Sequence, residues 1–457
     1  MKKLLTIICF IGFNAVFFAQ NNAAIKSFRY DDNFTYLKND TSKNWYTQMK
    51  FIPLNASKEN YISAGGEVRY QYFYYKNERW GDIPNDKDGY ILTRFLLHID
   101  IHASKSFRAF FQLQSSNANG RINPNLIENN PLDYHQAFFD INISNKNESK
   151  LIFRGGRQEM SYGSQRLVSV RELPNSRLSF DGLKLIFNTT NLNTDLFYSH
   201  PVVNSIGIFD NHFNKDSKFW GSYTVLNSVP FLNNIDFYYL GLWKRNSIFD
   251  DGAGKETRHS LGTRVWKNSG NWHYDFEGVY QFGNLENQTI RGWTISSNTT
   301  YQFKKNKYVP TVGLKSEYIS GDKNYEDERI ETFNPLYPRG AYFGIVGLIG
   351  PSNLIDIHPS INLEFSSKLN FALDYDIFWR ASINDGIYNP NQRLIYSGKN
   401  SFKKFIGTQL SNEIIYQTSN QFAFKCGATW FNSGSFIKDS GAGKDIFFGS
   451  TTIQYKF

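Results

Sequence analysis

The chain ends with Asp445-Ile-Phe-Phe-Gly-Ser-Thr-Thr-Ile-Gln-Tyr-Lys-Phe457. If this stretch is an extended strand, one face carries Phe447, Gly449, Thr451, Ile453, Tyr455 and Phe457. The other face carries Phe448, Ser450, Thr452, Gln454 and Lys456. An alternating strand that ends on an aromatic residue is the usual last strand of a bacterial outer-membrane barrel. Taken alone, the stretch also fits a buried strand at the end of a soluble sandwich.

The other end of the chain has the pattern of an export signal. Lys2 and Lys3 precede an apolar run from Leu4 to Phe18, and Ala19-Gln20 is a plausible cleavage point. The run is too short for a comfortable transmembrane helix and lies at the very start, so we predict a secretory signal peptide over residues 1–19. A lipid anchor at Cys9 is disfavoured, since too little of the apolar run precedes it. The chain is therefore predicted to reach the periplasm, the outer membrane or the cell exterior.

The composition suits a barrel whose outer face alone meets lipid. Aromatic residues make up 17% of the 457 residues, although only 40% of the chain is hydrophobic. A lipid-facing barrel needs an apolar residue only at every second position, with aromatic girdles at both interfaces. The formal net charge is +9, but no compact Lys/Arg run exists, so we predict no nucleic-acid partner. Basic residues lie singly on strands, which favours a lumen lining, and the mature chain keeps one cysteine, which excludes an internal disulfide.

A period of two persists from residue 62 to the end of the chain. It predicts about eighteen strands, near 62–75, 89–103, 106–116, 133–143, 150–159, 179–188, 192–199, 217–228, 233–245, 257–267, 270–282, 289–303, 307–319, 354–366, 368–381, 403–417, 420–431 and 445–457. The fold class is therefore all-β, a transmembrane antiparallel barrel over residues 62–457. An even number near eighteen fits a bacterial barrel and predicts an aqueous lumen.

Two segments fall outside the strand rhythm. Residues 20–61 are polar and irregular, and we predict that they form a periplasmic N-terminal segment. Residues 320–353 are rich in Gly, Pro and Asn and are far longer than a hairpin turn. We predict a long extracellular loop there, folded over the mouth of the barrel or into its lumen.

The inward-facing polar residues are mixed in sign and leave two interpretations open. They either pair with one another, as in any water-filled barrel, or form a basic constriction that selects anions. The densest cluster contains Arg154, Arg157, Glu159, Arg166, Arg171, Glu172, Arg177 and Asp181. Alternation turns Arg154 inward and Arg157 to the opposite side, unless a bulge intervenes or Arg157 lies beyond the apolar band.

Patterns of catalytic and metal-binding residues are weak. The eight histidines are scattered, and His98 and His102 have helical spacing within a predicted strand. No Gly-x-Ser-x-Gly motif and no cysteine pair are present. We therefore predict no catalytic residues, no metal and no cofactor. A barrel enzyme or a surface receptor remains the alternative from another functional class.

An ordered set of short motifs resembles the alginate export family of outer-membrane porins, from about residue 28 to the end. The motifs include Gly65-Gly-Glu-Val-Arg69, Gly156-Arg-Gln-Glu159, Gly163-Ser-Gln-Arg-Leu167, Arg258-His-Ser-Leu-Gly-Thr-Arg264, Thr332-Phe-Asn-Pro-Leu-Tyr-Pro-Arg-Gly340 and Leu348-Ile-Gly-Pro-Ser-Asn-Leu-Ile-Asp356. The resemblance implies a monomeric eighteen-stranded barrel in the outer membrane of a Gram-negative bacterium. It also implies an electropositive lumen that passes anionic polysaccharide outward, with periplasmic secretion proteins as partners.

The resemblance further assigns solute binding to lumen arginines that lie beside a few acids. We carry this role to Arg154, Arg157, Arg69, Arg94, Arg166 and Arg177, with Glu159 and Asp181 as the acids. The residues themselves support only an anionic or polar solute, so alginate is an inference from the family. The first alternative is a less selective porin for small solutes or sugars.

Overall fold

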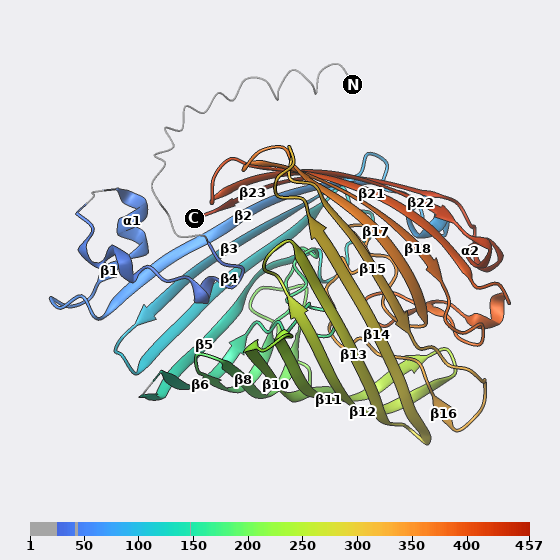
Figure 1. Ribbon diagram of the computed structural model, residues 1–457, viewed down its shortest axis with the longest axis horizontal. Coiled ribbons are helices and arrows are strands. Elements are labelled where there is room, and N and C mark those ends of the chain that lie inside the picture. The colour runs from blue at the N-terminus through green and yellow to red at the C-terminus, as the bar shows by residue number, and fades with distance from the viewer. Residues whose placement is uncertain (1–24, 42–43, 147) are drawn as a thin grey trace, which may run out of the picture.

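The structure, a computed structural model, describes residues 25–41, 44–146 and 148–457. The signal peptide predicted for residues 1–19 lies outside the described residues. Within the described chain, eighteen long antiparallel strands form one closed barrel (Figure 1). The barrel closes where β23 (Ile446–Lys456) pairs with β2 (Tyr61–Lys76), with Phe447 opposite Lys76 and Lys456 opposite Glu67.

Each predicted strand is present, with its ends within a few residues of the prediction. The other barrel strands are β3 (Tyr90–His102), β4 (Phe107–Asn119), β5 (Asn130–Lys146), β6 (Ser149–Gln158), β7 (Phe180–Asn188), β8 (Leu192–Val203), β10 (Ser217–Val229), β11 (Asn233–Phe249), β12 (Gly252–Lys267), β13 (Trp272–Leu285), β14 (Gln288–Gln302), β15 (Thr311–Ile319), β17 (Leu354–Glu364), β18 (Leu369–Trp379), β21 (Phe405–Gln417) and β22 (Phe422–Ser433).

The remaining elements are short and belong to the connections. They are the strands β1 (Ile52–Pro53), β9 (His212–Phe213), β16 (Arg329–Ile330), β19 (Ile387–Tyr388) and β20 (Leu394–Tyr396), the α-helices α1 (Trp45–Lys50) and α2 (Ser435–Ser440), and the 3-10 helices η1 (Arg29–Asp31), η2 (Thr35–Asn39), η3 (Glu78–Gly81) and η4 (Gly398–Asn400). None of the described helices is long and apolar enough to span a membrane.

The period of two places apolar side chains outside and polar side chains inside the barrel. On β2, Tyr70 and Tyr72 are exposed, whereas Glu67, Arg69 and Gln71 are buried. The same alternation on the other strands leaves an outward band of exposed apolar and aromatic side chains, which is the surface that lipid requires. The strand pattern therefore separates a lipid-facing surface from a charged interior.

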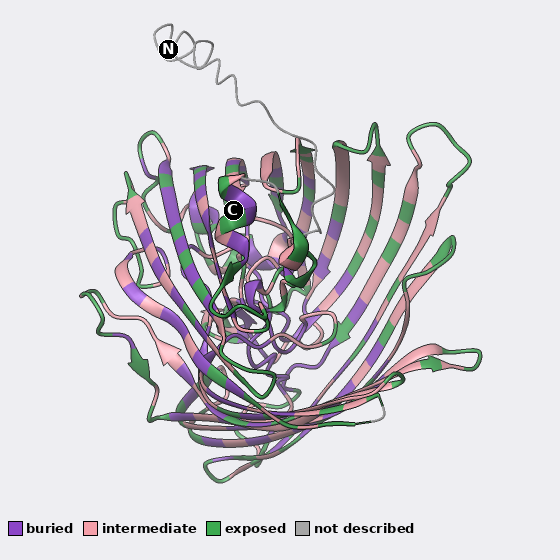
Figure 2. Ribbon diagram, turned by 90° about the vertical axis from the view of Figure 1, so that its left-hand side faces the viewer, coloured by how far each residue is buried: buried purple, intermediate pink, exposed green. Residues whose placement is uncertain are grey.

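Loops narrow the lumen that the strand number predicted, and one of them is the segment 320–353 that the sequence predicted to fold over the mouth or into the lumen. Two long connections, residues 159–179 between β6 and β7 and residues 320–353 between β15 and β17, fold inward and join each other. The amide of Ser169 donates to the carbonyl of Tyr337 at 2.9 Å, and Tyr342 is almost fully buried. These loops carry apolar side chains that complete a core with inward strand residues. Figure 2 shows irregular segments within the ring of strands.

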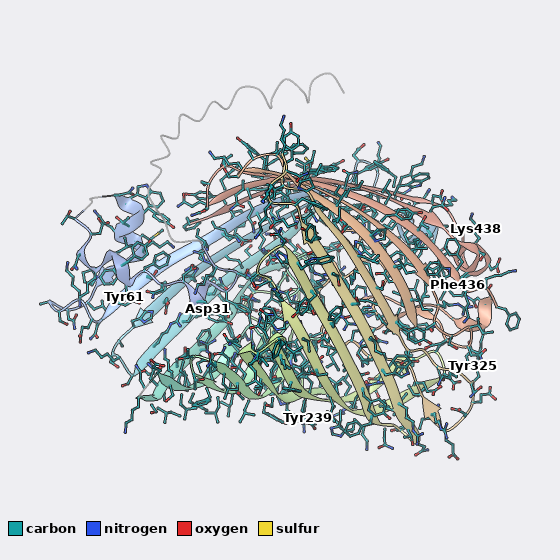
Figure 3. The ribbon with its side chains drawn as sticks, in the orientation of Figure 1. Asp31, Tyr61, Tyr239, Tyr325, Phe436 and Lys438 are labelled. Carbon is teal, nitrogen blue, oxygen red and sulfur yellow. The ribbon has the colours of Figure 1, made fainter. Side chains whose placement is uncertain are left out.

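The N-terminal segment reaches into the barrel from the end where the chain finishes. Arg29 donates to the carbonyls of Gly66 and Phe457, both at 2.9 Å. Tyr30 then packs edge-on against Phe110 and Phe138, with ring centroids 5.8 and 5.3 Å apart. The turns at this end are short, which is typical of the periplasmic end of a bacterial barrel. Figure 3 places Asp31 towards this end, and Tyr325, Phe436 and Lys438 towards the other.

Candidate functional site

Three arginines converge on one loop carboxylate inside the barrel. Arg69 on β2 and Arg94 on β3 lie directly opposite each other, and Arg177 comes from the inward loop 159–179. Glu172 of the same loop lies 3.4 Å from Arg69 and 3.2 Å from Arg177, and it also pairs with Arg94. We call Arg69, Arg94 and Arg177 the arginine cluster.

Two further carboxylates, both buried, neutralise charges of the arginine cluster. Glu67 on β2 accepts from Arg94 Nε at 2.9 Å, and Glu159 lies 2.9 Å from Arg177 Nε. His135 contacts the same Glu159 oxygen at 2.7 Å. Glu67 and Glu159 are buried, so these pairs are enclosed by protein. Like charges placed opposite each other on neighbouring strands are destabilising, and these carboxylates offset that repulsion.

Glu172 differs from the other two carboxylates because its side chain is half exposed. Its relative exposure is 50%, against 4% for Glu67 and 1% for Glu159. Enclosure by the barrel would by itself raise the pKa of Glu172, but Arg94, Arg177 and Arg69 hold this pKa well below its usual range. Glu172 therefore stays ionised and is the accessible anion on the guanidinium groups. Its position is the one that a solute carboxylate would need.

The cluster is fixed to the loop by backbone as well as by charge. Arg69 donates to the carbonyl oxygens of Glu172 and Pro174 at 2.8 and 3.1 Å. Asn175, which is fully buried, donates to the carbonyl oxygens of Thr93 and Glu128 at 3.0 and 2.9 Å. The guanidinium groups are therefore held in place before any solute arrives.

Arg154 lies in the lumen but is occupied by protein groups. Its guanidinium forms a bidentate salt bridge with Asp140 on β5, with nitrogen–oxygen distances of 2.7 and 2.8 Å. Its guanidinium carbon lies 4.0 Å from the ring centre of Phe138 and 4.5 Å from that of Tyr30. The N-terminal segment thus covers Arg154 on the periplasmic side of the arginine cluster.

Arg157 lies on the opposite side of β6 from Arg154, as alternation alone predicted. The pairing between β6 and β7 has no register shift, so no bulge turns Arg157 inward. Arg157 instead pairs with Asp181 at 2.7 and 2.9 Å and donates to the carbonyl of Asn211 at 3.3 Å. Asn211 belongs to the connection between β8 and β10, so this pair ties the barrel wall to that loop.

Arg166 joins the two inward loops to the far wall. It donates to Tyr342 Oη at 2.6 Å and pairs with Glu277 on β13 at 2.9 Å, and Glu317 on β15 lies 3.4 Å away. Of the residues predicted for the site, the structure brings together Arg69, Arg94, Arg177 and Glu159. Arg154, Arg166 and the Arg157–Asp181 pair lie at three other places.

Sequence reasoning included Glu172 in the densest arginine cluster and paired Glu67 with Arg69, but assigned solute binding to neither. Glu67 had a signal, because it lies two residues before Arg69 and therefore on the same strand face. Glu172 stands among loop arginines, and nothing in its local sequence shows which strand it meets.

The extracellular connections contain a pair of buried carboxyl groups with raised pKa values. Asp322 donates its amide to Asp385 Oδ2 at 2.9 Å, and Asp385 also accepts from Thr332 and Tyr388 at 2.6 Å. Burial raises the pKa of Asp322 to about 8 and that of Asp385 to about 6. Both groups are therefore neutral in acid and become charged in a buried site as the pH rises.

Packing of this loop is expected to weaken at alkaline pH. Both folded pKa values exceed the ordinary carboxyl value of 3.8. The stability that the neutral carboxyls contribute is therefore complete below pH 3.8 and is lost as the pH rises through the folded pKa values of about 6 and 8. At about 1.4 kcal/mol for each pH unit between about 5 and the raised pKa of each group, we expect a loss of several kcal/mol between about pH 5 and about pH 8. Urea unfolding across this pH range should show the loss. Asp322→Asn should reduce the pH dependence of the free energy of unfolding at the alkaline end of the range. A slope unchanged by Asp322→Asn would contradict this assignment.

The closed antiparallel barrel and its apolar outer band define an outer-membrane porin. Solved porin structures are similar in fold. Acinetobacter baumannii OccAB1 has a TM-score of 0.59 at 11% identity, covering 90% of this chain and 99% of that one. Pseudomonas aeruginosa OccK8 (OprE) has a TM-score of 0.57 at 13% identity, covering 87% and 98%. P. aeruginosa OccK2 (OpdF) in complex with glucuronate has a TM-score of 0.56 at 10% identity, covering 87% of this chain and 98% of that one.

The family is shown by the sequence itself. The family model described as alginate export matches residues 60–445, so the chain belongs to the alginate export family. The search of curated proteins found no match to this chain. Membership and fold place the protein in the outer membrane.

Proposed function

We propose that the protein is an outer-membrane channel for an anionic, uronate-containing saccharide, an alginate-like polyuronate or its oligomers. The arginine cluster around the half-exposed Glu172 carries this proposal. Planar guanidinium groups bind carboxylates through two parallel hydrogen bonds, and a uronate presents a carboxylate on every sugar ring. The likeness to OccK2, whose solved structure holds glucuronate, supports the same solute chemistry.

In this mechanism Glu172 is a competitor built into the channel. An arriving uronate carboxylate replaces Glu172 on Arg69, Arg94 and Arg177, and Glu172 returns when the solute moves on. Because each exchange replaces one carboxylate by another, binding is strong enough to favour entry and weak enough for release, as conduction requires. Glu67 and Glu159 keep the guanidinium groups in place during the exchange.

The direct test is the single-channel current of the refolded protein in a planar bilayer. We expect an anion-selective reversal potential in a salt gradient and block by an added oligouronate. A conducting channel without anion preference would favour the less selective porin instead. Ligand binding or catalytic turnover without any conductance would favour the receptor or the enzyme.

Replacing Glu172 by glutamine should strengthen both the anion selectivity of the channel and its block by oligouronate. The exchange removes the accessible competitor and leaves the arginine cluster with one extra positive charge. We expect a shift of the reversal potential towards stronger anion selectivity and an affinity for oligouronate about tenfold higher, equivalent to about 1.4 kcal/mol. Glu59→Gln is the matched control, since the Glu59 side chain is 48% exposed and its one ion pair among the described residues is with the exposed Lys105. Equal behaviour of the two variants would exclude Glu172 as a competitor.

A further inference from the structure

A second charged cluster lies on the inner face of β17 and β18. Asp356 and His358 are two residues apart on β17 and therefore share a face, and Asp376 lies beside them on the antiparallel β18. One ligand-type atom from each of the three lies within 4.8 Å of the other two. Asp356 and Asp376 are buried, and His358 is partly accessible.

Asp356 is a buried carboxylate without a compensating partner. Its side chain is fully buried, and neither carboxylate oxygen has a hydrogen-bond partner among the described residues. Lys315 on the neighbouring β15 is paired with Glu317 at 3.2 Å and forms no ion pair with Asp356 in the described chain. A buried carboxylate without a partner is strongly disfavoured while it is ionised, so Asp356 either keeps its proton or meets a cation.

The other two side chains are oriented from outside the cluster. His358 Nε2 lies 2.9 Å from Asp374 Oδ1, and Asp376 Oδ2 accepts from Gln409 Nε2 at 3.0 Å. This leaves His358 Nδ1 and Asp376 Oδ1 facing inward, 2.7 Å apart but without hydrogen-bond geometry. A carboxylate that holds one ring nitrogen of a histidine is the usual second partner of a metal-ligating imidazole.

We propose that Asp356, His358 and Asp376 bind a divalent transition-metal ion, with Zn²⁺ as the representative. One imidazole nitrogen and two carboxylate oxygens form a ligand set that Zn²⁺ accepts, with a fourth position left for water. A divalent charge would neutralise Asp356 and Asp376 while His358 stays neutral. Asp374 and Gln409 are positioning residues that set the direction of the inward atoms. The proposal is independent of the solute that the channel passes.

The test uses the full chain, refolded in detergent and treated with a chelator that is then removed. Calorimetric titration with Zn²⁺ is expected to show one tight site per chain, absent in Asp356→Asn and in His358→Gln. Asp374→Asn should retain the site with an affinity about 10- to 100-fold lower, because the outer carboxylate orients the ligand. His273→Gln is the matched control, since the His273 ring bonds to the carbonyl of Gly270 at 3.2 Å beside a short turn, and it should leave the titration unchanged.

A second measurement does not depend on the folding of the variants. X-ray absorption of the Zn²⁺-loaded wild-type protein should show one imidazole and oxygen ligands at about 2.0–2.2 Å. Asp356→Asn should also stabilise the metal-free protein while abolishing stabilisation by Zn²⁺. The absence of a tight site in the wild type, or a site that survives both Asp356→Asn and His358→Gln, would overturn the proposal. The cluster would then be a histidinium held between Asp374 and Asp376.

Discussion

Replacing Arg94 by methionine is expected to destabilise the barrel by about 3–5 kcal/mol and to abolish block by oligouronate. Arg94 is fully buried and pairs with Glu67 and Glu172. Its loss leaves the buried Glu67 without its closest counter-charge and removes the guanidinium that faces Arg69. Urea unfolding of the refolded protein measures the first effect, and single-channel current in the presence of oligouronate measures the second.

Two comparisons separate the structural role of Arg94 from its role in binding. Arg245→Met removes an ion pair whose partners, Arg245 and Asp216, are 64% and 58% exposed, and it should change stability by less than about 1 kcal/mol. The double variant Glu67→Gln/Arg94→Met removes both charges and should recover much of the stability. If it also recovered oligouronate block, the cluster would not be the binding site.

Removing the anchors of the N-terminal segment is expected to raise the single-channel conductance several-fold. Arg29 holds the segment to two backbone carbonyls, and the buried Tyr30 packs among aromatic rings and donates to the carbonyl of Glu159 at 3.2 Å. Loss of a buried aromatic side chain typically costs about 3–5 kcal/mol, which is enough to undock a short segment. The double variant Arg29→Ala/Tyr30→Ala should therefore conduct with its periplasmic mouth open, as recorded in planar bilayers.

The control for this prediction is Trp45→Ala in the same N-terminal segment. Trp45 is 64% exposed and its ring contacts Tyr46. This variant should conduct like the wild type. If the double variant also conducted like the wild type, the segment would not limit the current, and the inward loops would be the narrowest part of the path.

The barrel was predictable from sequence because the rule that produces it is local. Lipid outside and charge inside force a period of two on each strand, and a run such as β2 shows it residue by residue. The interior was not predictable, because the strand number sets only the width of the ring. Whether loops fill that width depends on contacts such as Ser169 with Tyr337, which join residues far apart in the chain.

The candidate site was predictable in part for the same reason. Arg69 and Arg94 face inward by alternation, and Arg69 also stands in the motif Gly65-Gly-Glu-Val-Arg69. The assignment of Arg157 to the same constriction is not supported by its position, since its own strand parity turns it away from the lumen. Glu172 and the Asp356–His358–Asp376 group required the register between separate segments, which a single sequence does not contain.

The contact of Arg29 with Gly66 and Phe457 has a consequence for assembly. Gly66 belongs to the first barrel strand and Phe457 follows the last, so Arg29 spans the seam at which the sheet becomes a cylinder. Its two acceptors come together only after β23 has joined β2, so docking of the N-terminal segment must follow closure. The N-terminal segment, which is synthesised first, therefore docks last. A barrel whose first and last strands have not yet paired has no binding site for this segment.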